Sequence, residues 1–340
     1  MKLLDQIFKP KPEKPRPCMR PDPVFIIGMH RSGTSALTGA LGALGFNTPH
    51  PGDRMDWPES NPEHWESVSL AAYNDDLLTR LGGSWEAPPD LPLKWEGDDA
   101  LSELGSPLPI LNAAFPESGP CVWKDPRLCL LLPFWKTSLP SPIAAVLVWR
   151  SPLAVARSLQ KRDGMYLADG IALWERYNRA ALRNLVGLNT FVCSYETVVR
   201  DPATAMNTIA DWLSALPQLS DMANQWHRTQ SADSIVQVNS PQENDAGNEV
   251  LLAQHHDLIL QLSSLEGGHL PLKVSPVASE SEWTTALLAA RSGSRTREFQ
   301  IELQNKQLEL DRLRDSTSWR ATKPLRSVIS HLRSARSKLP

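Results

Sequence analysis

Residues 24–35 have the sequence VFIIGMHRSGTS. Residues 24–27 form a continuous apolar run, which is typical of a strand buried in a parallel sheet. Residues 28–35 are mostly small and predict a tight loop, and residues 36–44 have the composition of a helix that Gly45 can end. A strand, a glycine-containing loop and a helix in this order begin a βαβ unit. The stretch therefore predicts an α/β fold with a polar loop at the end of its first strand.

Other apolar segments extend this pattern. The clearest is residues 143–149, with the sequence IAAVLVW. Strands are also predicted at residues 121–123 and 190–195, and helices over 67–81, 169–186 and 202–215, with one more that ends near 162. Strands that alternate with helices favour a three-layer, P-loop-like α/β fold with a central parallel sheet.

The two ends of the chain differ from this body. Residues 1–23 are rich in Pro and Lys, and because each proline removes a backbone donor, we expect an extended linker there. The α/β domain is expected over residues 24–290. Residues 291–340 are predicted to be a C-terminal helical appendage, made of an exposed helix over 295–315 and a basic tail.

The charge is distributed unevenly along the chain. The 340 residues include 35 Lys and Arg and 38 Asp and Glu, a net charge of −3. Residues 1–22 contain six basic and three acidic residues, and residues 319–340 contain six basic and no acidic residues, so the body between them has 23 basic and 35 acidic residues and a net charge of −12. An acidic body argues against a cationic nucleic-acid-binding protein, and we expect no nucleic-acid partner.

The sequence favours a cytoplasmic protein. It has no uninterrupted run of 18 apolar residues, and its first residues lack the apolar core of a secretory signal. The four cysteines are widely spaced, without a CxxC pair, which predicts free thiols in a reducing compartment.

The loop limits the chemistry. Residues 28–35 match the phosphate-loop pattern GxxxxGK[ST], except that Thr34 takes the place of the lysine. That lysine normally reaches the β- and γ-phosphates, so its absence argues against ATP or GTP hydrolysis. An amide cradle with Arg31 as a fixed cation suits a compact anion such as a phosphate or a phosphosulfate. A purely structural turn is the alternative.

Two motifs resemble the cofactor-binding segments of the sulfotransferases, which use 3′-phosphoadenosine 5′-phosphosulfate (PAPS). The sequence RSGTS at residues 31–35 is similar to the 5′-phosphosulfate loop of that family. Arg150 follows the strand at 143–149, and Ser158 follows eight residues later, which resembles the Arg and Ser pair that holds the 3′-phosphate. The resemblance implies PAPS as the co-substrate.

Two further motifs strengthen this resemblance. The sequence SYE at residues 194–196, with Asp201-Pro202, is similar to the segment whose tyrosine lies near the adenine. The sequence WKDPR at residues 123–127 resembles the Lys-Asp-Pro segment of tyrosylprotein sulfotransferases. The four motifs follow the order of the family over residues 24–202, although its usual C-terminal Arg-Lys-Gly loop is missing.

The resemblance implies roles for individual residues. The cofactor-binding residues would be His30, Arg31, Ser32, Gly33, Thr34, Ser35, Arg150, Ser158 and Tyr195. Arg31 is expected to stabilise the bridging oxygen, and His30 either contacts the phosphosulfate or packs under the loop. Lys124 is expected to reach the sulfuryl oxygens, with a surface ion pair to Asp125 as the alternative. Arg127 either binds the substrate or pairs with Asp125.

The candidates for the general base lie in residues 59–66, which have the sequence ESNPEHWE. Cytosolic sulfotransferases have a histidine where this chain has Pro126, so that mechanism is not carried over. The segment resembles an Asn-Pro…Glu motif of bacterial sulfotransferase-like sequences, and Glu66 is the first candidate, His64 the second and Glu63 the third. A base here needs a pKa that burial raises. The alternative is that Glu66 only stabilises the start of a helix.

No metal is expected in this site. The adjacent His255 and His256 would point to different faces of any regular element. The tail at residues 316–326, STSWRATKPLR, is similar to terminal segments of bacterial glycosyl- and methyltransferases that build cell-surface polysaccharides. A helix that ends in basic residues can contact an anionic membrane surface or a partner, and a solvated tail is the alternative.

Together these features predict an enzyme. It would transfer the sulfuryl group of PAPS to a hydroxyl of a carbohydrate or glycolipid-linked acceptor by in-line displacement. Positioning and electrostatic stabilisation would supply most of the catalysis. Two alternatives stay open: a P-loop sugar or nucleotide kinase, and a non-catalytic scaffold of a polysaccharide-biosynthesis assembly.

Overall fold

The computed structural model of the chain describes residues 21–55, 64–91, 106–117, 119–139, 144–217, 219, 255–274 and 277–293. The chain divides into two compact units, Met1–Leu288 and Ala289–Pro340. Most of the predicted linker, and nearly all of the predicted appendage, lie outside the described residues. Within the described part of the chain, no helix is both long and apolar enough to cross a membrane.

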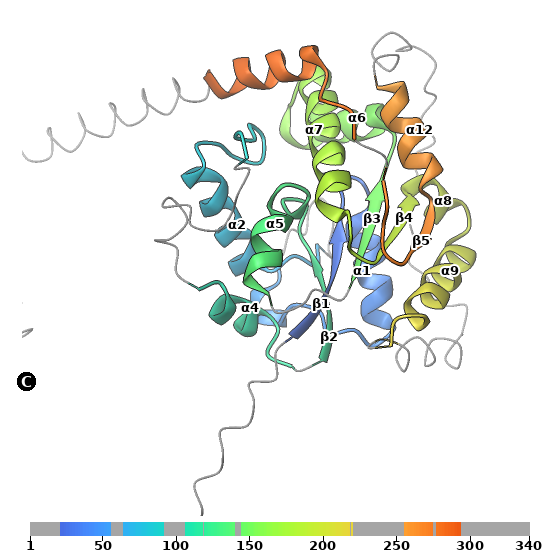
Figure 1. Cartoon of the computed structure of the whole chain (residues 1–340). Coiled ribbons are helices and arrows are strands. Elements are labelled where there is room, and N and C mark those ends of the chain that lie inside the picture. The colour runs from blue at the N-terminus through green and yellow to red at the C-terminus, as the bar shows by residue number, and fades with distance from the viewer. Residues whose placement is uncertain are drawn as a thin grey trace, which may run out of the picture. The chain divides into compact units, whose positions relative to one another are not determined.

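The centre of the first unit is a sheet of five strands in the order β2-β1-β3-β4-β5. The strands are β1 (Pro21–Ile27), β2 (Gly119–Lys124), β3 (Ala144–Trp149), β4 (Thr190–Ser194) and β5 (Gly267–His269). Strands β1 to β4 are parallel, and β5 is antiparallel to β4. Figure 1 shows β1 and β3 in the middle of the molecule. The prediction of a central parallel sheet is confirmed for β1 to β4, and β5 adds an antiparallel strand at the edge.

Strand β1 begins at Pro21, inside the segment predicted to be a linker. Pro21 and Pro23 align with β2, whereas the pairing of β1 with β3 begins only at Val24. A proline lacks the N–H that a ladder needs, so it is tolerated where a strand is paired on one side. The last three residues of the predicted linker, 21–23, therefore belong to β1.

Helices cover the sheet. They are α1 (Thr34–Ala43), α2 (Val68–Arg80), α4 (Leu108–Ala114), α5 (Leu128–Ser138), α6 (Pro152–Asp163), α7 (Leu167–Leu185), α8 (Tyr195–Arg200), α9 (Pro202–Ser214) and α12 (His256–Ser264), with a 3₁₀ turn η1 (Pro51–Asp53) and a helical segment over 282–293. Many begin directly after a strand, as the alternation in the sequence predicts.

Each face of the sheet has its own apolar core, because side chains alternate along a strand. Phe25 and Ile27 of β1 point to one face and join a core built with α2, α5 and α7. Val24 and Ile26 point to the other face and join a core built with α1 and α9. Side chains on both faces of β1 are buried under helices. The sheet therefore lies between two layers of helices, and the three-layer prediction is confirmed (Figure 1).

Candidate anion-binding and catalytic site

The polar loop after β1 is forced into close contact with its neighbours. A Cβ on Gly28 would lie 2.3 Å from the backbone oxygen of Val148 in β3. Gly33 has φ 89°, and a Cβ there would lie 2.1 Å from the ring of Tyr195. Only glycine fits at both positions, since one needs space and the other needs both space and a left-handed backbone. The loop therefore lies at the carboxyl end of the sheet, with Tyr195 against it.

This loop leads into the N-terminus of α1. Gly33 is the N-cap and supplies no side-chain hydrogen bond, and the first turn of α1 contains no acidic residue. The Ser32 hydroxyl and His30 Nε2 are buried, and neither has a hydrogen-bond partner within the described part of the chain. Buried polar groups are normally paired. Free helix donors and two orphaned polar atoms in one loop fit an anionic ligand.

His30 also packs against aromatic rings. Its imidazole lies 4.3 Å from the Trp85 ring and 6.0 Å from the Tyr177 ring, measured between centroids. Burial lowers the pKa of His30 well below its ordinary value, and the charges of Arg127, Arg162, Lys124 and Arg31 act in the same direction. The side chain is therefore neutral, and it can donate or accept one hydrogen bond at Nε2.

A first group of polar side chains, which we call the arginine subsite, consists of Arg31, Arg150, Ser158 and Tyr195. Arg31 Nε donates to Ser158 Oγ over 2.8 Å, and Arg150 Nη1 donates to the Arg31 carbonyl over 3.3 Å. The Arg150 guanidinium lies 4.6 Å from the centre of the Tyr195 ring. Four residues separated by up to 164 positions in the sequence thus meet beside the loop.

Three guanidiniums influence one another at the arginine subsite. Burial and the neighbouring guanidiniums of Arg162 and Arg150 lower the pKa of Arg31, although it stays charged. Arg162 stands four residues after Ser158 on α6, and its guanidinium lies 5.5 Å from the Trp85 ring. Arg162 was not among the predicted site residues, but its i+4 spacing from Ser158 places both on one helix face and could have revealed it.

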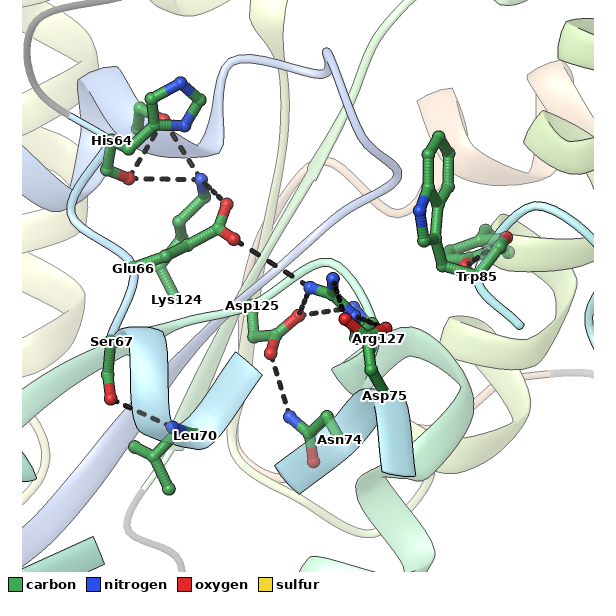
Figure 2. A network of polar contacts seen from close by, with 12 residues as sticks. His64, Glu66, Ser67, Leu70, Asn74, Asp75, Trp85, Lys124, Asp125 and Arg127 are labelled. Carbon is green, nitrogen blue, oxygen red and sulfur yellow. Dashed lines mark hydrogen bonds and ion pairs between the residues drawn. The ribbon is translucent and has the colours of Figure 1, made fainter. Parts of the chain in front are cut away.

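A second group, which we call the lysine subsite, consists of Lys124, Ser35, Glu66 and the carbonyl of His64. Lys124 is at the end of β2 and is 3% exposed. Its Nζ forms an ion pair with Glu66 and donates to Ser35 Oγ over 3.1 Å and to the His64 carbonyl over 3.2 Å. Figure 2 shows the contacts with Glu66 and with the His64 carbonyl converging on the ammonium of Lys124. The alternative expectation, a surface ion pair of Lys124 with Asp125, is wrong, because Lys124 is buried and pairs with Glu66.

The carboxylate of Glu66 is charged in this arrangement. Burial alone would raise the pKa of Glu66, but the charge and hydrogen bond of Lys124 and the charge of Arg127 hold it below its ordinary value. Arg127 Nη1 lies 3.9 Å from the second Glu66 oxygen. The expected raised pKa of the base is therefore absent while Lys124 is paired with it.

The other two base candidates differ from Glu66. The carbonyl of His64 contacts Lys124. Burial and the charge of Lys124 lower the pKa of the His64 imidazole. Glu63 lies outside the described residues. Glu66 is thus the candidate whose carboxylate the structure brings directly to Lys124.

Arg127 is held behind Glu66 by two carboxylates. Its Nε and Nη2 donate to Asp75 over 2.6 and 2.8 Å, and its Nη1 donates to Asp125 over 3.1 Å. Asn74 Nδ2 donates to the other oxygen of Asp125 over 2.8 Å (Figure 2). Trp135 Nε1 donates in turn to Asn74 Oδ1. Arg127 thus pairs with Asp125, as one alternative expected, and it pairs with Asp75 as well. The sequence held no signal for Asn74 and Asp75.

The two adjacent histidines lie elsewhere. His255 is buried with its Nε2 3.1 Å from Glu175, which also accepts hydrogen bonds from Ser281 and Thr284, whereas His256 begins α12. Across the described ranges, no cluster of three or more His, Cys, Asp or Glu side chains is arranged to hold a metal ion.

Neither a family model nor a curated protein matches the chain. The solved structures that are similar to it include two sulfotransferase domains. One is the sulfotransferase domain from the curacin biosynthetic pathway, with 15% identity, 80% of this chain and 97% of that chain covered, and a TM-score of 0.35. The other is the sulfotransferase domain from the Synechococcus PCC 7002 olefin synthase, with 15% identity, 80% and 95% covered, and a TM-score of 0.31.

Proposed function

We propose that the chain is a sulfotransferase that uses PAPS and transfers its sulfuryl group to a hydroxyl of a carbohydrate or glycan. The observation that carries the proposal is the placement of two cationic groups beside one loop. Arg31, Arg150 and Ser158 lie together in the arginine subsite, and Lys124 reaches Ser35 in the lysine subsite. A ligand with two separate anionic groups matches this pair of sites.

The residues present fit such a donor. The α1 N-terminus, Ser32 and His30 would hold the 5′-phosphosulfate, and Arg150 and Ser158 would hold the 3′-phosphate beside the Tyr195 ring. The Arg31 side chain reaches Ser158, so we assign it to the 3′-phosphate as well, in addition to the expected role at the bridging oxygen. PAPS supplies an activated sulfuryl group whose bond to the 5′-phosphate breaks as the acceptor oxygen bonds to sulfur.

Lys124 and Glu66 then have complementary tasks. Lys124 would stabilise the negative charge on the sulfuryl oxygens and the leaving phosphate. Glu66 would take the proton of the acceptor hydroxyl on a carboxylate oxygen. The three N–H donors of Lys124 go to Ser35, the His64 carbonyl and Glu66, so Lys124 has to give up one of these contacts to bind the donor. When Lys124 turns to the donor, its positive charge no longer lowers the pKa of Glu66, and burial raises that pKa against the remaining charge of Arg127.

The carbohydrate acceptor has a separate basis. It rests on the resemblance of residues 316–326 to segments of polysaccharide-building enzymes, and these residues lie outside the described ranges. A kinase is less well supported, since Thr34 stands in the lysine position of the phosphate loop. A cytoplasmic location, and membrane or partner contact through the basic tail, belong to the same proposal.

The first experiment compares two nucleotides by thermal unfolding. Adenosine 3′,5′-bisphosphate (PAP) is expected to raise the melting temperature by several degrees at saturating concentration, and AMP by much less. Arg150→Ala should abolish that difference, whereas Arg200→Ala, a matched change at an exposed arginine of α8, should preserve it. A melting curve that PAP does not shift would falsify PAPS use. The acceptor is then sought by mass spectrometry of glycans from a deletion strain, as a lost sulfate mass.

A further inference from the structure

Trp65, between the two residues that contact Lys124, has an unusual backbone. Its φ is +55°, in the left-handed region. A bulky side chain rarely adopts this conformation outside a constrained turn, and such residues gather at functional sites. The surrounding structure must therefore hold Trp65 in place.

Two segments clamp the indole of Trp65. The Arg54 guanidinium lies 4.6 Å from the centre of its ring. On α1, a Cβ added to Gly39 would lie only 3.0 Å from Trp65 Nε1, so the indole packs closely on the helix backbone. Arg54 is itself fixed, because its Nε donates to the Pro49 carbonyl over 2.8 Å and its Nη2 donates to Thr48 Oγ1 over 2.7 Å.

The backbone on both sides of Trp65 is held as well. Met55 N donates to the Glu66 carbonyl over 2.8 Å, and Arg54 forms an antiparallel bridge with Ser67. The turn at Trp65 lets the carbonyl of His64 and the carboxylate of Glu66 reach the same Lys124 Nζ. A relaxed turn would move these two acceptors relative to the ammonium and to the loop.

We propose that Trp65 is a positioning residue for sulfuryl transfer. Clamped between Arg54 and Gly39, its indole keeps the left-handed turn that aims the Glu66 carboxylate at Lys124 and at the acceptor hydroxyl. Trp65 itself contacts no reacting atom. The inference rests on the proposed function, and it adds a residue whose effect on the rate acts through Glu66.

The test compares Trp65→Leu, Trp65→Phe and a matched control. Trp65→Leu removes the aromatic face and is expected to lower the transfer rate at saturating PAPS by roughly 10- to 100-fold, the usual cost of misplacing a catalytic group by about 1 Å. Trp65→Phe keeps a ring under Arg54 and should restore part of the rate. The PAP-induced melting shift and the KM for PAPS should stay close to the parent values. Trp212→Phe, at a tryptophan that packs on Phe191 in the other core, should leave the rate unchanged.

A second measurement does not depend on activity. Lys124 is shielded by its contacts with Glu66 and His64, so labelling by an amine-reactive reagent, followed by peptide mass spectrometry, should be slow in the parent and in Trp212→Phe, and clearly faster in Trp65→Leu. Unchanged labelling, or a Trp65→Leu enzyme as fast as the parent, would overturn the inference. If the parent neither binds PAP nor transfers sulfuryl but Lys124 labelling still responds to Trp65, the proposed function fails while the control of Trp65 over the Glu66 turn stands.

Discussion

The arginine and lysine subsites lie beside the same loop, yet their charges are balanced differently. Within the described part of the chain, Arg31 and Arg150 have no carboxylate at ion-pairing distance, and their contacts are to a hydroxyl, a carbonyl and an aromatic face. Lys124, in contrast, pairs with Glu66, and the neighbouring Arg127 pairs with Asp75 and Asp125. Among the described residues, the guanidiniums of Arg31 and Arg150 in the arginine subsite have no carboxylate partner, whereas Lys124 in the lysine subsite is paired with Glu66.

This difference separates binding from chemistry. An unneutralised pair of guanidiniums gains most when a permanently charged phosphate enters, so the arginine subsite suits ligand recognition. A buried lysine–carboxylate pair is costly to break by removing one partner. That cost is avoided when the lysine exchanges the carboxylate for a new anion. The lysine subsite is therefore suited to chemistry, because this exchange leaves the carboxylate free to take a proton.

The largest expected effect comes from breaking the lysine subsite. Glu66→Gln keeps the shape and can still accept a hydrogen bond from Lys124, but it cannot take a proton. The rate of a single turnover with saturating PAPS is expected to fall by about 10²- to 10⁴-fold. PAP should still raise the melting temperature, since the arginine subsite is untouched.

Glu280→Gln is the matched control for this change. Glu280 is also paired with an arginine, Arg176, over 2.5 and 2.7 Å, but it is remote from the loop in sequence and contacts neither subsite. Its loss should lower stability without a comparable fall in rate. A Glu66→Gln enzyme that keeps the parent rate would remove Glu66 as the base and direct attention to His64.

A smaller effect is expected from the arginine subsite. Arg31→Lys keeps the positive charge but loses the Nε that donates to Ser158 and the planar fork of the guanidinium. If Arg31 serves the 3′-phosphate, the preference for PAP over AMP, measured by titration calorimetry, should fall by about tenfold, the value of one charge-assisted hydrogen bond. Equal losses of affinity for PAP and AMP would place Arg31 at the 5′ end alone. Arg200→Lys, at an exposed helix position, should change neither affinity.

The same contrast explains what could be predicted from the sequence. The loop, Arg150, Ser158 and Tyr195 follow strands at the carboxyl edge of one sheet, so topology alone predicts that they meet. The network behind Lys124 depends on α2, whose Asn74 and Asp75 become neighbours of Asp125 only through packing. Such contacts between distant segments leave no periodic signal in one sequence.

Secondary structure shows a similar limit. Helix α5 is apolar around most of its circumference and contains Pro133, so it lacks the amphipathic period that identifies a helix. Strand β5 has the sequence Gly-Gly-His, without β-branched or aromatic residues, and it forms because β4 offers a free edge. Long-range packing decides both elements.

The smallest effect separates the two subsites by pH. The pKa of Glu66 is held below its ordinary value in the folded protein, so the unfolded chain takes up this proton first as the pH falls. The ion pair therefore contributes its full stability above the pKa of an unfolded glutamate, about 4.3, and that contribution is lost as the pH falls toward the folded pKa. Chemical unfolding from pH 7 down to pH 3 should show a flatter loss of stability in Glu66→Gln than in the parent. Arg31→Lys should leave that slope unchanged, because a guanidinium and an ammonium both stay protonated in this range. Equal slopes in the parent and Glu66→Gln would mean that Lys124 does not pair with an ionised Glu66, and the exchange between the pair and a bound anion would lose its basis.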